Sequence, residues 1–373
     1  MRFIGIGFAL VCSMFLLTAT AQAEAARKVL IVVSSEGRDQ GKTRPGFEFD
    51  EFAQAWSIFR ANGFMIEVAS PAGGRAEPDA FDAKNVYNAP VVADQEAQKW
   101  LLATTPTSSV RARDYSGIYL IGGGGAMFDL FGDKALQSLL ARAFESGAVV
   151  GGVCHGPAVL ANVRLSNGSL LVGGRRITGF ANAEEEVFGK RWASSYPIFL
   201  ETALRKSGAK FEQAEVMLPH VVADGRLVTG QNPFSTALSV EAMIRAMGKE
   251  PVARVKYSDE RALLLVARYL RGDVAGVREE LAADPKAHDT KLIATYGTIV
   301  VGGSGGKADL ILQGPGLMEL AAFHVSSPRL EIAMAQAEVQ LGRKSAARAR
   351  VERILVGSPD NEPARKLLAA MKE

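Results

Sequence analysis

The sequence predicts an α/β fold, a mostly parallel sheet sandwiched by helices, with an additional C-terminal region that is mainly helical. Three observations indicate this architecture. Apolar runs of strand length alternate with amphipathic stretches of helix length between residues 27 and 248. The runs are nearly continuous, which is typical of parallel strands buried on both faces. After about residue 250 the strand-like runs give way to helical patterns.

The expected elements follow in order along the first part of the chain. KVLIVVSS from Lys28 is the first strand, and the next stretch has apolar residues at helical spacing from Phe49 to Phe59, closed by Gly63. FMIEVASP, SGIYLIGG and AVVGGV are further strands, and LFGDKALQSLLARAFESG is a helix between the last two. RLVTG and the helical FSTALSVEAMIRAMG close the unit near Gly248.

Residues 1–23 have the pattern of a secretory signal peptide. Arg2 precedes an apolar run that ends in small residues, so we expect cleavage after Ala23. A single membrane anchor is the alternative, but the apolar core is short for a spanning helix. The pattern therefore predicts a periplasmic or secreted protein with no membrane contact after cleavage.

Charge and cysteine content narrow the function further. The net charge of +3 is spread along the 373 residues without a basic block, so we exclude nucleic acid as the main partner. Removal of Cys12 with the signal peptide would leave Cys154 as the only cysteine, which rules out an intramolecular disulfide. A lone thiol in an oxidising compartment is a liability unless it is buried or useful.

The C-terminal region, 250–373, contains helical patterns and one ambiguous stretch. Two helices are expected to join at Gly272, and 328–371 reads as helix, turn, helix, break and helix. That second segment resembles one tetratricopeptide-like repeat, while a helical hairpin docked on the main domain is the open alternative. The glycine-rich residues 295–316 are expected to form loop and short strand, because no Lys-Ser/Thr follows the glycines as in a phosphate-binding loop.

The motif Gly152-Val153-Cys154-His155-Gly156 has the form of the nucleophile elbow G-x-S-x-G, with sulfur in place of oxygen. It follows an expected strand and precedes an expected helix. The glycines leave room for a sharp, strained turn. The N-terminus of the next helix is expected to lower the thiol pKa, which favours the reactive thiolate. We predict that Cys154 is a nucleophile, since an inert core thiol would not need these glycines.

No metal and no cofactor are predicted. Cys154 and His155 are adjacent, so we expect their side chains to diverge, and no second cysteine remains to build a thiolate site. The other histidines, His220, His288 and His324, are scattered through the chain.

The stretch VVGGVCHGPAVL resembles the elbow of the PfpI-type, or class I glutamine amidotransferase-like, superfamily. It is most similar to the chaperone and glyoxalase branch, the thirty-one-kilodalton heat-shock class. Other stretches agree in order and spacing: RPGFEFDEFAQAWSIFRANGFMIEVASPAGG, IYLIGGGGAMFDL, and ITGFANAEEEVFG with DGRLVTGQNP. The resemblance covers residues 27–248 and implies a flavodoxin-like sheet and a homodimer.

The resemblance also implies site residues. Glu51, five residues after Gly46, matches a carboxyl group that lies beside the cysteine and shares a proton with it, with Glu48 and Asp50 as nearby competitors. His155 matches a proton-handling histidine. Its acidic partner matches Glu185, although the flanking acids, Glu184 and Glu186, leave the choice among the three open.

A glycine loop completes the implied site. Gly123, Gly124 and Gly125 match a loop whose backbone N–H groups face a developing oxyanion, joined by the N–H of His155. Gly124 stands where the branch often carries a histidine, so a side-chain contribution from that position is absent here.

These features lead to an exported cysteine-dependent enzyme acting on small reactive carbonyls, a cofactor-independent glyoxalase or deglycase-like protein. A PfpI-like peptidase or amidohydrolase acting on peptides is one alternative. The other is a non-enzymatic stress chaperone or redox sensor, in which Cys154 is oxidised and the C-terminal region binds protein or forms oligomer contacts.

Overall fold

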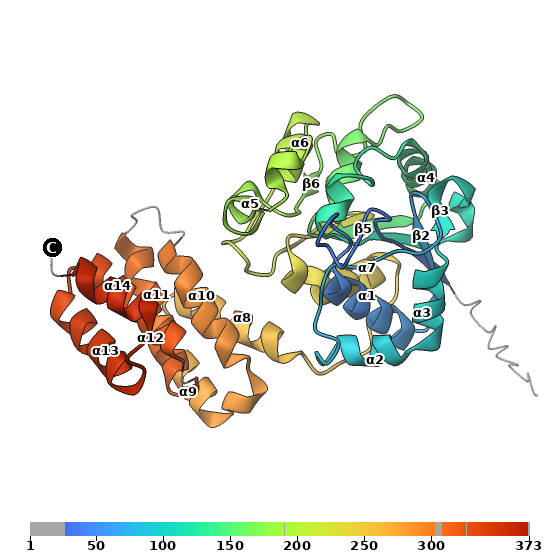
Figure 1. Cartoon of the computed structure of the whole chain (residues 1–373). Coiled ribbons are helices and arrows are strands. Elements are labelled where there is room, and N and C mark those ends of the chain that lie inside the picture. Colours follow the sequence, from blue (N-terminus) through green and yellow to red (C-terminus); the bar gives the residue numbers. More distant parts are fainter. Residues whose placement is uncertain (1–26, 190, 303–307, 326, 372–373) are drawn as a thin grey trace, which may run out of the picture.

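The protein consists of two lobes, an α/β domain and a smaller helical region (Figure 1). The structure is a computed structural model that describes residues 27–189, 191–302, 308–325 and 327–371. The predicted signal peptide lies outside these residues. None of the helices within them has both the length and the hydropathy of a membrane span.

A seven-stranded sheet forms the centre of the α/β domain. Its strand order is β3-β2-β1-β4-β5-β9-β8, and every neighbouring pair is parallel except β8 and β9. This arrangement confirms the predicted mostly parallel sheet. The strands are β1 (Lys28–Val32), β2 (Met65–Ser70), β3 (Thr105–Pro106), β4 (Gly117–Leu120), β5 (Val149–Val153), β8 (Val221–Asp224) and β9 (Leu227–Gly230).

Helices cover both faces of the sheet, and each face has its own core. Successive residues of β1 point to opposite faces. Val29 and Ile31 pack in the core that includes residues of α1 (Phe49–Ala61), α2 (Asn88–Ala93), α3 (Gln95–Leu102) and α7 (Thr236–Ala246). Leu30 and Val32 pack in the core that includes residues of α4 (Lys134–Glu145) and α6 (Leu200–Lys206). Burial of β1 on both faces explains why its sequence is continuously apolar.

Additional short elements lie between β5 and β8. They are the 3-10 helix η4 (Gly156–Asn162), β6 (Arg176–Ile177), α5 (Asn182–Phe188) and β7 (Lys210–Phe211), with β6 and β7 forming a parallel two-stranded sheet.

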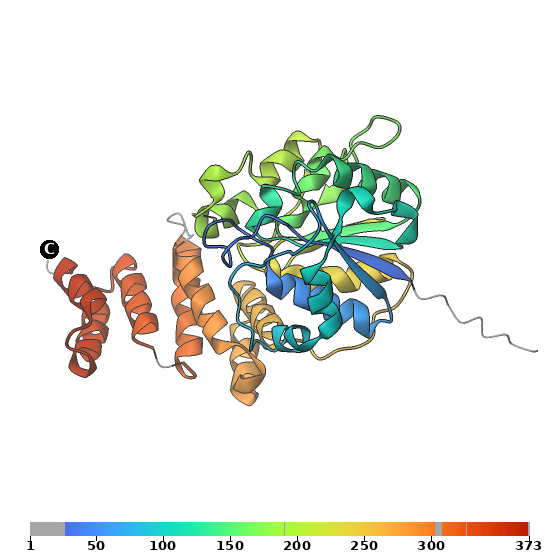
Figure 2. The same ribbon diagram turned by 45° about the vertical axis from the view of Figure 1, so that its right-hand side comes forward.

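The region after residue 257 consists of helices throughout its described residues. The helices are α8 (Ser258–Leu270), α9 (Val274–Ala283), α10 (Thr290–Gly302), α11 (Ala308–Ala322), α12 (Pro328–Gln340), α13 (Lys344–Gly357) and α14 (Glu362–Ala370). In both views α8 and α10 lie nearest the α/β domain, while α13 and α14 lie at the far end (Figures 1 and 2).

The prediction of loop and short strand over 295–316 is wrong, because α10 and α11 occupy the described part of that stretch. Its glycines let two helices approach closely rather than interrupting them. A Cβ built on Gly297 of α10 would lie 2.7 Å from the carbonyl oxygen of Gly314 in α11, and the reverse distance is also 2.7 Å. Tertiary packing thus outweighs the low helix propensity of glycine here.

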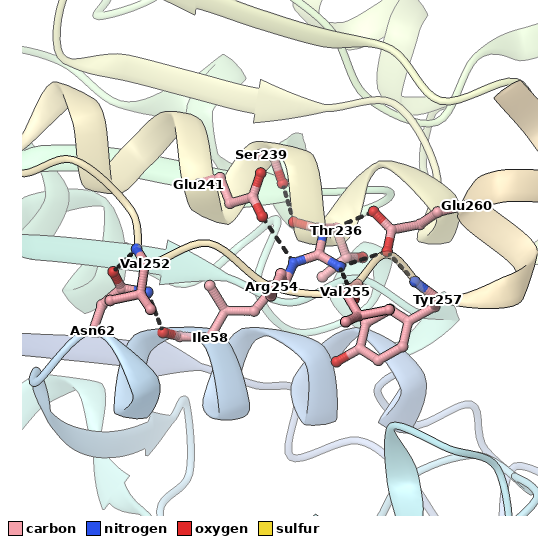
Figure 3. Close-up of polar contacts among 10 residues, drawn as sticks. All are labelled: Ile58, Asn62, Thr236, Ser239, Glu241, Val252, Arg254, Val255, Tyr257 and Glu260. Atoms are coloured by element: carbon pink, nitrogen blue, oxygen red, sulfur yellow. Dashed lines mark hydrogen bonds and ion pairs between the residues drawn. The ribbon is translucent and has the colours of Figure 1, made fainter.

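Arg254 ties the two lobes together at their junction (Figure 3). Its guanidinium donates to Glu241 of α7 at 2.8 Å and to both carboxylate oxygens of Glu260 in α8 at 2.6 and 2.7 Å. The segment between α7 and α8 also lies against the C-terminal end of α1, since the N–H of Val252 donates to the side chain of Asn62, the residue that follows α1, at 2.8 Å. The helical region is therefore held in a defined position on the α/β domain.

Candidate active site

Cys154 lies directly after β5, at the carboxyl edge of the sheet, where α/β proteins commonly bind ligands. Its backbone has φ of +57°, a left-handed conformation that is uncommon for a residue other than glycine. The flanking glycines are required by close contacts with β4. A Cβ on Gly152 would lie 2.9 Å from the Leu120 side chain, and one on Gly156 only 2.4 Å from the Leu120 carbonyl oxygen. The strand and the sharp turn therefore match the elbow geometry.

The element after the turn differs from the expected α-helix, because η4 is a 3-10 helix of 7 residues. The expected lowering of the thiol pKa is also not found. Burial raises the pKa of Cys154 well above its usual range and the charge of Glu51 raises it further, while a hydrogen bond from the Gly123 N–H acts in the opposite direction. Desolvation and a nearby acid thus outweigh the backbone dipoles at this sulfur.

Glu51 comes from the first turn of α1 and is fully buried beside Cys154. One carboxylate oxygen accepts a hydrogen bond from the Gly122 N–H at 2.7 Å, and the other has no N–H or hydroxyl donor among the described residues. Burial and the charge of Glu48 raise the pKa of Glu51 well above its usual range, and hydrogen bonds from Gly122 and the Cys154 thiol partly oppose this.

The proximity of Glu51 and Cys154 makes them a coupled pair. Two neighbouring buried anions repel each other, so the pair retains a proton around neutral pH and titrates as a unit. The geometry therefore allows the carboxyl group and the sulfur to exchange a proton, as the resemblance implies.

His155 contacts both Cys154 and an acidic residue. Its Nδ1 lies 3.4 Å from the Cys154 sulfur, so the two side chains do not diverge as expected. Its Nε2 lies 2.6 Å from Oε1 of Glu185, which selects Glu185 from the three neighbouring acids. Glu184 instead accepts hydrogen bonds from the start of its own helix and from backbone and amide groups of other segments, and Glu186 is exposed.

The glycine loop contributes unequally to the site. Gly123 and Gly124 line the pocket with Cys154, and the Gly123 N–H favours the thiolate. The N–H of Gly125 donates to the Gly46 carbonyl at 2.9 Å, so that donor is already engaged and does not face an oxyanion. The loop prediction therefore needs correction at Gly125.

A pocket of about 240 Å³ opens above Cys154. It is lined by Cys154, His155, Glu48 and glycines of the predicted site, and by residues that the sequence did not indicate: Phe180, Phe188, Gly189, Arg191, Trp192, Tyr196, Met217 and Pro233. The His155 ring packs against Phe180 and Tyr196, with ring centroids 4.5 and 5.8 Å apart. The sequence signal that could have located this side of the pocket was the group of aromatic residues after Glu185, namely Phe188, Trp192 and Tyr196.

Glu48 is the carboxylic acid that lines this pocket. Burial raises its pKa to about 8, and the charges of Asp50 and Asp79 add to the effect. A carboxyl group with this pKa is mostly protonated at neutral pH, so it can donate a hydrogen bond to an oxygen bound beside Cys154. The sequence suggested Glu48 only as a competitor of Glu51, whereas the two carboxyl groups occupy different places in the site.

Within the described residues, no group of three or more His, Cys, Asp or Glu side chains has a geometry suited to a metal ion. The prediction of chemistry without metal or cofactor stays a prediction.

The fold and the site together define a class: α/β proteins with a cysteine elbow beside a buried glutamate and a histidine. The sequence profile of the DJ-1/PfpI family matches residues 43–245, and the chain belongs to that family. The resemblance to the PfpI-type glyoxalase and heat-shock branch is thereby confirmed.

Several relatives carry descriptive names. The glutathione-independent glyoxalase hsp3101 of Schizosaccharomyces pombe is 30% identical over 243 residues, which cover 58% of this chain and 95% of that protein. The crystal structure of glyoxalase III from Candida albicans is 27% identical with a TM-score of 0.55, covering 59% of this chain and 97% of that one. The X-ray structure of Rapid Encystment Protein 24 KDa from Francisella tularensis is 26% identical with a TM-score of 0.56, covering 59% and 99%.

Proposed function

We propose that this protein is an exported glyoxalase that converts small 2-oxoaldehydes such as methylglyoxal to 2-hydroxy acids without glutathione, metal or organic cofactor. One observation carries the proposal: Cys154 lies in a small pocket in contact with both Glu51 and the His155–Glu185 pair. The names of the relatives hsp3101 and glyoxalase III support the same activity. A pocket of about 240 Å³ suits a small carbonyl better than an extended peptide.

In the first step, the Cys154 sulfur bonds to the aldehyde carbon, the thiol proton passes to Glu51 or His155, and the carbonyl oxygen takes up a proton to give a hemithioacetal. The raised thiol pKa means that the proton leaves as the sulfur attacks, with these acceptors already in place. The neutral carboxyl group of Glu48 and the N–H groups at Gly124 and His155 stabilise the developing oxyanion.

In the second step, a base removes the proton from the former aldehyde carbon and the neighbouring ketone oxygen takes up a proton, which gives an enediol. A proton is then returned to the former ketone carbon, and the hydroxyl group on the sulfur-bearing carbon loses its proton to become the carbonyl of the product. The substrate is thereby oxidised at one carbon and reduced at the next, so no external electron carrier is required. The product is a thioester of Cys154. Water then hydrolyses this thioester, which releases the 2-hydroxy acid and restores the thiol.

Export remains part of the proposal and is supported by the signal-peptide pattern of residues 1–23. A protein whose mature form has one buried cysteine is compatible with an oxidising compartment, because that thiol has no intramolecular partner.

The test compares methylglyoxal consumption, lactate formation and peptide cleavage by the full chain and its variants. We expect Cys154→Ala to lower kcat by about 10³-fold or more and Glu51→Gln by about 10²-fold, as for nucleophile and proton-transfer residues. Glu145→Gln, at an exposed glutamate of α4, is the matched control and should keep full activity.

Full turnover by Cys154→Ala would refute the mechanism. Peptide cleavage without aldehyde turnover would support the peptidase alternative. Oxygen addition at Cys154 by peroxide, without turnover of either substrate, would support the redox sensor.

A further inference from the structure

Met217 lies in the pocket wall in a strained conformation. Its side chain lines the pocket above Cys154, and its backbone φ is +60°. A methionine in the left-handed region persists only where its surroundings hold it there. The contacts of Met217 and its neighbours therefore decide the shape of this wall.

The α/β domain holds Met217 from one side. Oε1 of Glu184 accepts a hydrogen bond from the Met217 N–H at 2.8 Å. The same oxygen accepts from the side-chain amides of Gln231 at 3.0 Å and Asn232 at 2.9 Å. Glu184 is therefore an anchor for the wall and not a partner of His155.

The helical region holds the residues on either side of Met217. The hydroxyl of Tyr296 in α10 donates to the carbonyl oxygen of Val216 at 2.8 Å, and the Tyr296 side chain is 1% exposed. On the other side, Leu218 is buried in the core formed by the helical region. Met217 itself packs against this core and also against the core that contains Cys154.

Residues 216–218 have room to move if the hydrogen bond from Tyr296 to Val216 is lost. A cavity of about 50 Å³ lies behind them, lined by Val216 and Tyr296 together with residues of α5, α8 and α10. The helical region cannot follow such a movement easily, because Arg254 fixes α8 to α7 through Glu241 and Glu260 (Figure 3).

We infer that Tyr296 is a positioning residue for the pocket: through its hydrogen bond to Val216 it sets the place of Met217, and thereby the size of the electrophile that reaches Cys154. The helical region is then a structural part of the substrate pocket, although all of the residues that line the pocket belong to the α/β domain. The inference rests on the proposed function only in taking Cys154 as the reacting thiol.

The test measures alkylation of Cys154 by a small and a bulky reagent, iodoacetamide and iodoacetanilide, in the full chain. Mass analysis of the peptide that contains Cys154 gives the two rate constants and their ratio. We expect Met217→Ala to raise the bulky-to-small ratio about tenfold, the scale on which an apolar pocket discriminates size. Tyr296→Phe should raise it about threefold, because it removes one buried hydrogen bond.

Tyr269→Phe is the matched control. It removes a hydroxyl from a tyrosine of the same helical core, where that hydroxyl lies against Gly316 of α11. This variant should leave the ratio unchanged. Thermal melting of each variant shows whether it is folded.

An unchanged ratio in Tyr296→Phe, with a change in Met217→Ala, would overturn the role of Tyr296. An unchanged ratio in both variants would overturn the claim that Met217 limits the size of the electrophile that reaches Cys154. Steady-state kinetics adds a second readout, in which Tyr296→Phe lowers KM for phenylglyoxal while kcat for methylglyoxal stays constant. If the wild type turns over neither aldehyde, the proposed function fails, while the alkylation ratio still tests this inference.

Discussion

The Nε2 atom of His155 lies 2.6 Å from Oε1 of Glu185, while Nδ1 of the same ring lies 3.4 Å from the sulfur of Cys154. When Nε2–H donates to the carboxylate, the lone pair of Nδ1 faces the thiol. This hydrogen bond therefore selects the tautomer that can accept the thiol proton.

Replacing Glu185 tests this relationship. We expect Glu185→Gln to lower kcat for methylglyoxal by about 10²-fold or more, because an amide does not hold the required tautomer. Glu186→Gln is the control, since that side chain is exposed on the same helix, and it should retain full activity. Equal losses in the two variants would contradict the role of Glu185.

Glu48 makes stability depend on pH. Its pKa rises from 4.5 to about 8 in the folded state, so between these values the folded protein binds the proton and the unfolded chain does not. The stability that comes from proton binding by Glu48 is fully present below the lower pKa and is lost as pH rises through about 8. Melting temperatures of the wild type should therefore fall more steeply than those of Glu48→Gln over this window, and parallel curves would show that Glu48 titrates normally.

Gly122 is where a single methyl group should remove activity. A Cβ there would lie 2.7 Å from the Cys154 Cβ and 2.8 Å from the backbone nitrogen of His155, so Gly122→Ala must displace the elbow. We expect a loss of activity of about 10²-fold or more, as for misplaced reacting groups. Gly132→Ala, which meets nothing within 4 Å, should be active. A fully active Gly122→Ala would mean that the elbow tolerates displacement.

Arg254 should contribute far more to stability than an ordinary surface arginine. Arg254→Ala leaves the carboxylate of Glu260, which is 7% exposed, without its charged partner, and we expect unfolding free energy to fall by about 3 kcal/mol. Arg245→Ala breaks an exposed pair with Glu250 and should cost less than about 1 kcal/mol. Urea unfolding measures both changes, and similar values for the two variants would contradict the special contribution of Arg254 to stability.

The elbow and the sheet were predictable because their determinants are local. Continuous apolar runs identify strands buried on both faces, and the glycines around Cys154 report a steric requirement of the turn itself. Glu51 and Glu185 required the family resemblance, since nothing local shows which acids approach Cys154 and His155.

The remaining features depend on packing between distant segments. Gly297 and Gly314 suggest a loop until α10 and α11 are seen to pack through them. The thiol pKa could not be obtained from the elbow alone, because its main causes are burial and the charge of Glu51. Met217 gave no sequence signal, since its position depends on Glu184 and on a tyrosine 79 residues further along.

The attachment of Leu218 and Phe234 to the helical region has a practical consequence for anyone who wants to produce the α/β domain by itself. Leu218 is buried in the core of the helical region, and Phe234 packs against it. A fragment ending near residue 248 would expose both side chains to water as a hydrophobic patch and would self-associate. Polar replacements at these two positions would be needed to keep such a fragment monomeric.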